Sequence, residues 1–208
     1  MSPVGRRERK KAATRQAIAD AALQLFLERG YDQVSIRDIA DAADVSTTTV
    51  FKHFSGKEAL VFDQEADRES ALIAAVRQRA DGQTIPDALR EHILRSWLPI
   101  AAHPQAAAFT DLVDSTPALR AYAEHMWTRH TDSLAAAIAD EVGVDHDDLT
   151  CATLARFVLE IPALARNRPD RRAAVETIFD VLTRGWAPPR GSGAEVQEQS
   201  HDRHADPS

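Results

Sequence analysis

Apolar residues recur along this chain at the three- and four-residue spacing of an amphipathic helix, and most Gly and Pro residues fall between these periodic segments. Alternation of apolar and polar residues, which would indicate strands, is scarce. The segment 9–29 is an example, because its apolar residues follow one helical stripe and Gly30 stands where a C-terminal cap belongs. We therefore predict an all-α fold of about nine helices.

Two short helices are expected between residues 34 and 54, because each has its own capping residue. Ser35 can cap the first helix, with Asp38 three residues later, and Ser46 can cap the second. Asp44 and Val45 form a tight turn between them. This arrangement is typical of a helix-turn-helix, in which one helix braces against the DNA backbone and the other enters the major groove.

The second short helix is expected to present a polar face. The spacing of Val50 and Phe54 turns them inward, which leaves the run Thr47 to Thr49 and Lys52 pointing outward. A Thr hydroxyl can exchange hydrogen bonds with base edges, and its methyl group can meet a thymine methyl. A Thr run can equally be a solvated helix face, but its place inside this motif, with lysines on its C-terminal side, favours DNA contact.

The charge distribution supports this interpretation. The net charge is -7 overall, yet residues 1–57 carry ten Lys and Arg against seven Asp and Glu, while residues 58–208 carry fifteen against twenty-five. All four lysines lie in the first part, at positions 10, 11, 52 and 57. A basic first part on an acidic remainder is expected when only the first part meets phosphates. The alternative is a solvated terminus with a chance excess of basic residues.

The first third of the chain resembles the tetracycline-repressor (TetR) family. The resembling stretches are IADAA (18–22), LFLERGY (25–31), VSIRDIA (34–40), VSTTTVFKHF (45–54) and KEAL (57–60). The resemblance implies a homodimeric transcriptional repressor that binds a palindromic operator in double-stranded DNA, with one recognition helix per half-site. It further implies that a small molecule bound in the C-terminal domain moves the fourth helix and pulls the two recognition helices out of register.

Carried over by position, the resemblance implies phosphate contacts from Ser35, Lys52, His53 and Lys57, and base contacts from Arg37, Thr47 and Thr48. The full predicted DNA-binding set is Ser35, Arg37, Ser46, Thr47, Thr48, Thr49, Phe51, Lys52, His53 and Lys57. The chain departs from the family pattern twice. Asp44 stands where the family usually has Gly, and Asp tolerates a left-handed backbone better than most residues. Phe51 stands where the family usually has Tyr, which leaves Phe51 with packing or a thymine-methyl contact.

The domain organisation follows from the motif and from composition. We predict a DNA-binding helix-turn-helix domain with a basic N-terminal arm over residues 1–56, and a helical regulatory and dimerisation domain over residues 57–186. Residues 187–208 are rich in Pro, Gly, Ser and charge, and we predict a disordered tail. The sequence from Ser55 to Glu58 has the pattern of a capping box, which would open a long helix reaching about Arg79 and joining the two domains.

The last two expected helices have the composition of a dimer interface. The segment 145–166 is apolar nearly all round, which in a water-exposed protein means burial on more than one side. Together with the segment 169–186 it can form a two-fold four-helix interface. The alternative is a helix buried in the core of one chain. The predicted interface residues are Leu154, Phe157, Val158, Ile161, Val175, Ile178, Phe179 and Leu182.

Large side chains gather on the three preceding helices. They are Trp97, Phe109, Leu112, Tyr122, Met126 and Trp127. They could line a pocket for a small, mainly apolar effector that releases the repressor. They could equally fill a core, and the domain would then be a dimerisation or protein-interaction module without a small-molecule inducer.

Other classes of protein are disfavoured. The chain has no run of about 18 apolar residues and no signal-peptide pattern, so we expect a cytoplasmic protein without a membrane partner. No Gly-rich phosphate loop, His-Glu metal motif or nucleophile elbow appears, so we predict no cofactor and no catalytic residue. His125 and His130 are not on one helical face, so we predict no metal site. An enzyme or ligand carrier with a vestigial DNA-binding region is the third alternative.

Overall fold

The computed structural model describes residues 5–185, and all the regular elements in this range are α-helices. They are α1 (Arg6–Arg29), α2 (Ile36–Ala42), α3 (Thr47–His53), α4 (Glu58–Val61), α5 (Glu65–Arg77), α6 (Ile85–Ala101), α7 (Ala106–Ser115), α8 (Pro117–Val142), α9 (Leu149–Ala165) and α10 (Arg171–Arg184). The predicted all-α fold is confirmed. The predicted tail, 187–208, and the expected last helical residue, Trp186, lie outside the described residues.

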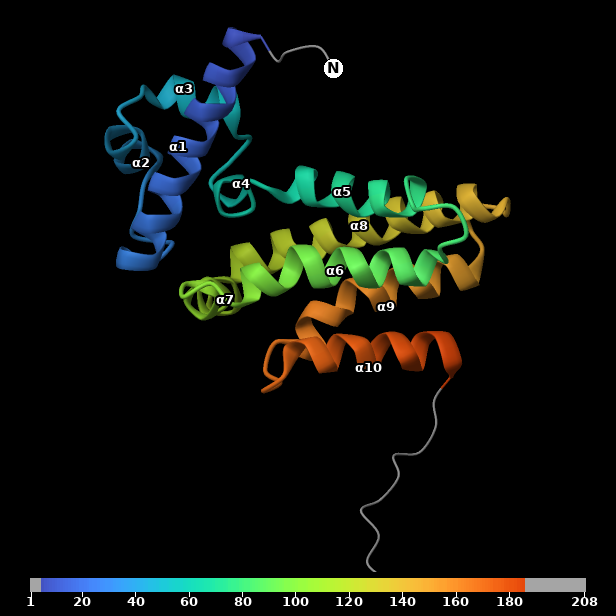
Figure 1. Ribbon diagram of the computed structural model, residues 1–208. Helices are drawn as coiled ribbons and strands as arrows, with labels where there is room; N and C mark the ends of the chain where they lie inside the picture. Colours follow the sequence, from blue (N-terminus) through green and yellow to red (C-terminus); the bar gives the residue numbers. More distant parts are fainter. Residues whose placement is uncertain (1–4, 186–208) are drawn as a thin grey trace, which may run out of the picture.

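Helices α1, α2 and α3 form one end of the molecule, which we call the head (Figure 1). Their apolar faces meet in a shared core built around Phe26 and Ile39, and α2 packs against both α1 and α3. Gly30 ends α1 with a φ of 84°, and its amide donates to the Phe26 carbonyl at 2.9 Å. A φ in this range favours glycine, so the predicted end of the first helix is confirmed.

Helices α5 to α10 form the body, in which α5, α6, α8 and α10 are roughly aligned, α7 lies across them, and α10 is on the side farthest from the head (Figure 1). Helix α8 packs against α5 and α9, while α10 packs against α6 and α9. The body core runs through these contacts, and Val76, Leu89, Ile138 and Phe179 are among its buried members. None of the helices in the described range combines the length and apolar character needed to cross a bilayer.

The head core continues beyond the head itself. Leu60 and Val61 of α4, Leu112 of α7 and Leu119 of α8 belong to the same buried cluster as the residues of α1 to α3. Helix α1 also packs against α4 and α7. Since burial of apolar surface stabilises all the elements that share it, this common core fixes the head against α4, α7 and α8.

The predicted long helix from about residue 57 to Arg79 is wrong in one respect, because it is divided into α4 and α5 with a turn over residues 62–64. The predicted capping box at Ser55 is also wrong, since Lys57 precedes α4 without a side-chain cap. A long-range contact accounts for the turn. The Asp63 carbonyl accepts a hydrogen bond from Arg15 of α1 at 3.0 Å, and Phe62 stacks on Tyr122 of α8. The division raises the number of helices within residues 5–185 to ten.

Candidate nucleic-acid interface

Side-chain caps hold both helices of the helix-turn-helix. The Ser35 hydroxyl accepts from the Asp38 amide at 3.2 Å, and the Asp38 carboxylate accepts from the Ser35 amide at 2.8 Å, which completes a capping box. The Ser35 hydroxyl also donates to the Asp38 carboxylate at 2.6 Å, and this bond and, after it, the bond from the Ser35 amide lower the pKa of Asp38. The Ser46 hydroxyl accepts from the Thr49 amide at 3.1 Å and caps α3. The predicted caps are confirmed, and each satisfies an amide that a helix start leaves unpaired.

The turn between α2 and α3 depends on Asp44. Its φ is 52°, and within residues 5–185 no other residue except glycines has a positive φ. The next amide, of Val45, donates to the Ala40 carbonyl at 2.9 Å and closes the turn. Asp accepts this left-handed conformation at a lower cost than β-branched residues do. The prediction that the turn survives without the usual Gly is therefore confirmed.

Helix α3 divides cleanly into a buried and an exposed side. Val50 packs into the head core, as does Phe54 directly after the helix. Thr47, Thr48, Phe51 and Lys52 are exposed and lie close together on the other side. The Phe51 side chain is 60% exposed, which is unusual for a residue of its size. Apart from Phe51, this side has the polar character that a recognition helix presents to a major groove.

The remaining predicted contact residues on α2 and α3 lie beside this exposed side. Arg37 is exposed and forms a long ion pair of 3.9 Å with Asp41, one turn away on α2. Thr49 is half-buried, and its hydroxyl is 2.8 Å from that of Ser46. Ser35 is engaged with Asp38 as described above. The Arg37 side chain is thus exposed and only weakly paired, whereas the hydroxyls of Ser35, Ser46 and Thr49 form hydrogen bonds at the helix ends.

A basic groove of about 370 Å³ lies between the first turns of α1 and the end of α3. Its lining consists of Glu8, Lys11, Ala12, Arg15, Lys52 and His53. Partial burial and, after it, the positive charges of Arg15, Lys11 and Lys52 lower the pKa of His53. The positive charges of Lys11, Arg15 and Lys52 around the groove suit a phosphate. Sequence reasoning singled out Lys52 and His53 but did not place Lys11 and Arg15 beside them, although their spacing of four residues on α1 was the available signal.

Lys57 does not lie with these groups. Its ammonium donates to the Tyr31 carbonyl and lies 4.1 Å from the centroid of the Tyr31 ring and 5.5 Å from that of Phe26. Burial lowers the pKa of Lys57, against the opposing effect of Asp32 and Glu58. The ammonium is engaged inside the head, so its placement differs from the phosphate contact predicted for it.

The six residues predicted to line an effector pocket lie in different surroundings. Trp97 packs against the body core, Phe109 and Leu112 belong with the head core, and Met126 is buried. Trp127 is 40% exposed, and its ring meets the buried His130 edge to face. Tyr122 lines a cleft of about 210 Å³ at the junction of head and body, but the other five do not.

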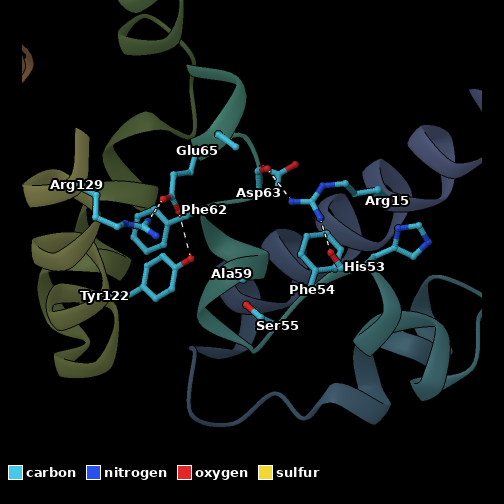
Figure 2. A pocket seen from close by; sticks show the side chains of 11 residues that line it. Arg15, His53, Phe54, Ser55, Ala59, Phe62, Asp63, Glu65, Tyr122 and Arg129 are labelled. Atoms are coloured by element: carbon cyan, nitrogen blue, oxygen red, sulfur yellow. Dashed lines mark hydrogen bonds and ion pairs between the residues drawn. The ribbon is translucent and has the colours of Figure 1, made fainter. Parts of the chain in front are cut away.

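Residues of both the head and the body line this junction cleft (Figure 2). Figure 2 shows Arg15, Asp63, His53 and Phe54 on the side of the head. Across the cleft, Tyr122 and Arg129 of α8 point toward Glu65, the first residue of α5. Glu65 accepts from the Tyr122 hydroxyl at 3.2 Å and pairs with Arg129. The carboxylate raises the pKa of Tyr122, second in effect to burial of the phenol.

The predicted dimer interface needs a correction. Val158, Ile161, Val175 and Phe179 are at most 1% exposed, because α9 and α10 pack them into the core of their own chain. For these four the alternative of a core within one chain holds. Leu154, Ile178 and Leu182 are half-buried at the edge of that core, and Phe157 is 47% exposed. Leu164 of α9 and Val181 of α10, which were not predicted, are also exposed.

Comparison with family models gives two matches that together cover most of the chain. Residues 18–63 match the model of bacterial regulatory proteins of the tetR family. Residues 83–187 match the model of the MftR C-terminal domain. The first match contains the helix-turn-helix and the second contains α6 to α10.

Individual relatives agree with these models. The chain is 32% identical to the HTH-type transcriptional regulator TcmR of Streptomyces glaucescens over 154 residues, covering 69% of this chain and 67% of TcmR. It is 26% identical to the putative mycofactocin biosynthesis transcriptional regulator MftR of Mycobacterium tuberculosis over 191 residues, covering 88% of this chain and 95% of MftR.

Solved structures share the fold at low sequence identity. NalD of Pseudomonas aeruginosa, the secondary repressor of the MexAB-OprM multidrug efflux pump, superposes with a TM-score of 0.58 at 20% identity, covering 86% of this chain and 100% of NalD. FadR of Bacillus subtilis in complex with stearoyl-CoA superposes with a TM-score of 0.54 at 19% identity, covering 83% of this chain and 99% of FadR.

Proposed function

The chain belongs to the TetR family of bacterial regulatory proteins and is a transcriptional regulator, and from this premise we propose that it represses transcription as a homodimer bound to a palindromic operator. The observation that carries the proposal is the exposed side of α3, formed by Thr47, Thr48, Phe51 and Lys52 beside the basic groove. The Thr side chains and Phe51 supply contacts to base edges. The groove supplies contacts to phosphates.

The phosphate contacts of this proposal come from Lys11, Lys52 and His53. Lys11 and Lys52 are exposed, and the groove they share holds a single carboxylate, that of Glu8. Two such grooves in a dimer would grip the backbone on both half-sites. Half-site centres should then be about one helical turn of DNA, or a small multiple of it, apart.

The test is selection of bound fragments from the genome that encodes the protein, followed by footprinting. We expect one or a few protected palindromes, with affinity for a scrambled sequence lower by about a thousandfold or more at the same salt concentration. Thr48→Ala should relax the preference at one base position, because the loss falls on a base contact. Equal affinity for selected and scrambled sequences would contradict the proposal.

We propose that the dimer forms through the exposed apolar residues of the last two helices, Phe157, Leu164 and Val181. Exposed apolar side chains on adjacent helices lose unfavourable contact with water when a second copy covers them. Phe157→Glu should yield a monomer in sedimentation analysis and weaken operator binding. Ile100→Glu, at an exposed apolar position on α6, is the matched control and should leave the dimer intact. A dimer that persists in Phe157→Glu would contradict this interface.

We further propose that a small, mainly apolar ligand releases the operator. The structural relative FadR was solved with stearoyl-CoA, so this fold can hold a ligand that includes a long apolar chain. Thermal denaturation with apolar acyl and aromatic compounds, paired with operator anisotropy, tests the proposal. A compound that raises Tm and lowers operator occupancy supports it. If compounds raise Tm but leave operator affinity unchanged, ligand release is contradicted.

The packing of the predicted pocket residues favours a second candidate, a body that serves as a filled dimerisation or protein-interaction module. Met126 and Leu112 are buried, and Trp97 packs against the body core. In this case Trp97→Ala should lower the free energy of unfolding, by less than the about 3 to 5 kcal/mol of a fully buried tryptophan because Trp97 is half-buried, and leave operator affinity unchanged. If a ligand instead displaced or contacted Trp97, the tryptophan fluorescence would change in the ligand titrations above, and the filled module would be contradicted.

A further inference from the structure

The turn between α4 and α5 (residues 62–64) and Glu65, the first residue of α5, form a segment whose backbone is bonded to the head through the Arg15 side chain. The Arg15 guanidinium donates through Nη2 to the Asp63 carbonyl at 3.0 Å and through Nη1 to the His53 carbonyl at 2.5 Å (Figure 2). It also lies over the Phe54 ring, 4.2 Å from the centroid. His53 is the last residue of α3, so a single side chain of α1 joins the end of the recognition helix to this turn.

The same segment is held from the side of the body by α8. Glu65 pairs with Arg129, accepts from the Tyr122 hydroxyl, and lies 3.6 Å from Nε2 of the buried His130. The Glu65 side chain is only 13% exposed, which strengthens these polar contacts. Phe62 stacks on Tyr122 with ring centroids 5.3 Å apart. A shift of this part of α8 therefore has to carry residues 62–65 with it or break several contacts at once.

We propose that Arg15 is a positioning residue that transmits displacement of α8 to the recognition helix through residues 62–65. This inference rests on the proposed function, since it names the path by which the body regulates the head. The path runs from Tyr122 and Arg129 through Glu65 and the Asp63 carbonyl to Arg15, and from Arg15 to the His53 carbonyl.

The geometry favours this path over the apolar contacts between α1 and α4. Apolar contacts have no directional preference and can slide, whereas hydrogen bonds weaken steeply when their angles change. The two bonds of Arg15 end on carbonyl groups that lie ten residues apart in sequence and on different elements. The planar, forked guanidinium presents a separate nitrogen to each carbonyl in a fixed geometry, and Lys has a single nitrogen. Lys at this position would therefore keep the charge and lose this two-nitrogen bridge.

The test is a double-mutant cycle on the full-length protein without DNA. Glu65→Ala removes the polar contacts between this segment and α8 and leaves the stacking of Phe62 on Tyr122 in place. Arg15→Lys removes the bridge while retaining the positive charge in the basic groove. Hydrogen exchange of the amides of residues 47–54 is the readout. We expect Glu65→Ala to speed this exchange about fivefold in the Arg15 background and to have no effect in the Arg15→Lys background. Additive effects of the two changes would overturn the proposal.

Arg77→Ala is the matched control. Arg77 pairs with Asp140 at 3.0 Å and so joins α5 to α8 as Glu65 does, but at the opposite end of α5. This change should leave the exchange of residues 47–54 unaltered. An effect as large as that of Glu65→Ala would overturn the proposal, because it would mean that any loosening of α5 from α8 reaches α3.

Two further measurements keep the result decisive. If Glu65→Ala fails to fold, Tyr122→Phe removes only the hydroxyl contact and takes its place, with a smaller expected effect of the same sign. Operator affinity, measured on the same variants, should be non-additive in the same way. The exchange readout needs no operator or effector, so loss of the proposed DNA-binding function would not hide the coupling. Additive exchange with intact operator binding would refute the coupling alone.

Discussion

Lys52 and Lys57 offer the sharpest test of the interface, because the resemblance implies the same phosphate contact for both and the structure separates them. Lys52 is exposed at the basic groove, whereas the Lys57 ammonium is engaged with the Tyr31 carbonyl and two aromatic rings. Lys52→Ala should therefore change DNA binding and leave stability nearly unaltered. Lys57→Ala should do the reverse.

The magnitudes follow from these contacts. Removing one phosphate contact from each subunit of a dimer should lower the slope of log affinity against log salt by about 1.8, at about 0.9 per contact. Lys57→Ala removes one hydrogen bond from a charged donor and a cation–π contact of 4.1 Å. Partial exposure reduces their combined worth to about 2 kcal/mol in the free energy of unfolding. For a chain of this length that is a fall in Tm of about 4 to 8 °C.

The assay is operator anisotropy between about 50 and 200 mM salt, together with thermal denaturation of the same samples. Lys57→Met is the control, since it retains most of the aliphatic stem and loses only the ammonium contacts. It should lose nearly as much stability as Lys57→Ala. If Lys57→Ala lowered the salt slope as much as Lys52→Ala while Tm stayed unchanged, the internal role of Lys57 would be refuted.

Three further predictions concern single positions of the helix-turn-helix. Asp44→Gly should raise the free energy of unfolding by up to about 1 kcal/mol because φ is 52°, and Asp44→Val should lower it by about 1 to 2 kcal/mol; denaturant titration measures both. Phe51→Tyr should tighten operator binding severalfold at unchanged Tm, since the side chain is exposed and gains a hydroxyl that can donate to the DNA backbone. Unchanged or weaker binding would contradict the proposed docking of α3 on DNA. Operator affinity should rise by up to about tenfold as pH falls from about 7.5 to 5.5, because a bound phosphate would raise the lowered pKa of His53 and favour its protonated form. His53→Gln should abolish this rise. Parallel pH profiles of the original protein and His53→Gln would contradict the phosphate contact.

The parts of the fold that sequence could predict depend on short-range contacts. The capping residues Ser35 and Ser46 act on amides three residues away, and the left-handed turn at Asp44 depends on one residue. Local pattern is sufficient for such features. The helical spacing of apolar residues was likewise enough for the all-α fold, because burial of one helical face repeats with the same period throughout.

The features that could not be predicted depend on partners far away in sequence. The turn after α4 depends on Arg15, which is 48 residues from Asp63, and the Lys57 ammonium meets a carbonyl 26 residues away. Neither pairing leaves a trace in local spacing. The error at the dimer interface has a different cause. A helix that is apolar nearly all round does not reveal which side faces its own chain. The sequence therefore predicted the buried Val158 and the exposed Phe157 equally as interface residues.

The shared core of head, α4, α7 and α8 has a consequence for protein engineering and for evolution. Exchanging DNA-binding modules between regulators is usually planned as a cut at a linker. A cut at residue 56 would separate Leu60, Val61, Leu112 and Leu119 from the α1 to α3 residues that they pack against. A foreign module would have to pack against these four residues without having been selected to fit them. A chimera built here needs these four positions redesigned along with the module. Natural recombination would face the same requirement, so operator preference in this lineage is more easily altered by substitution on α3 than by transfer of the whole head.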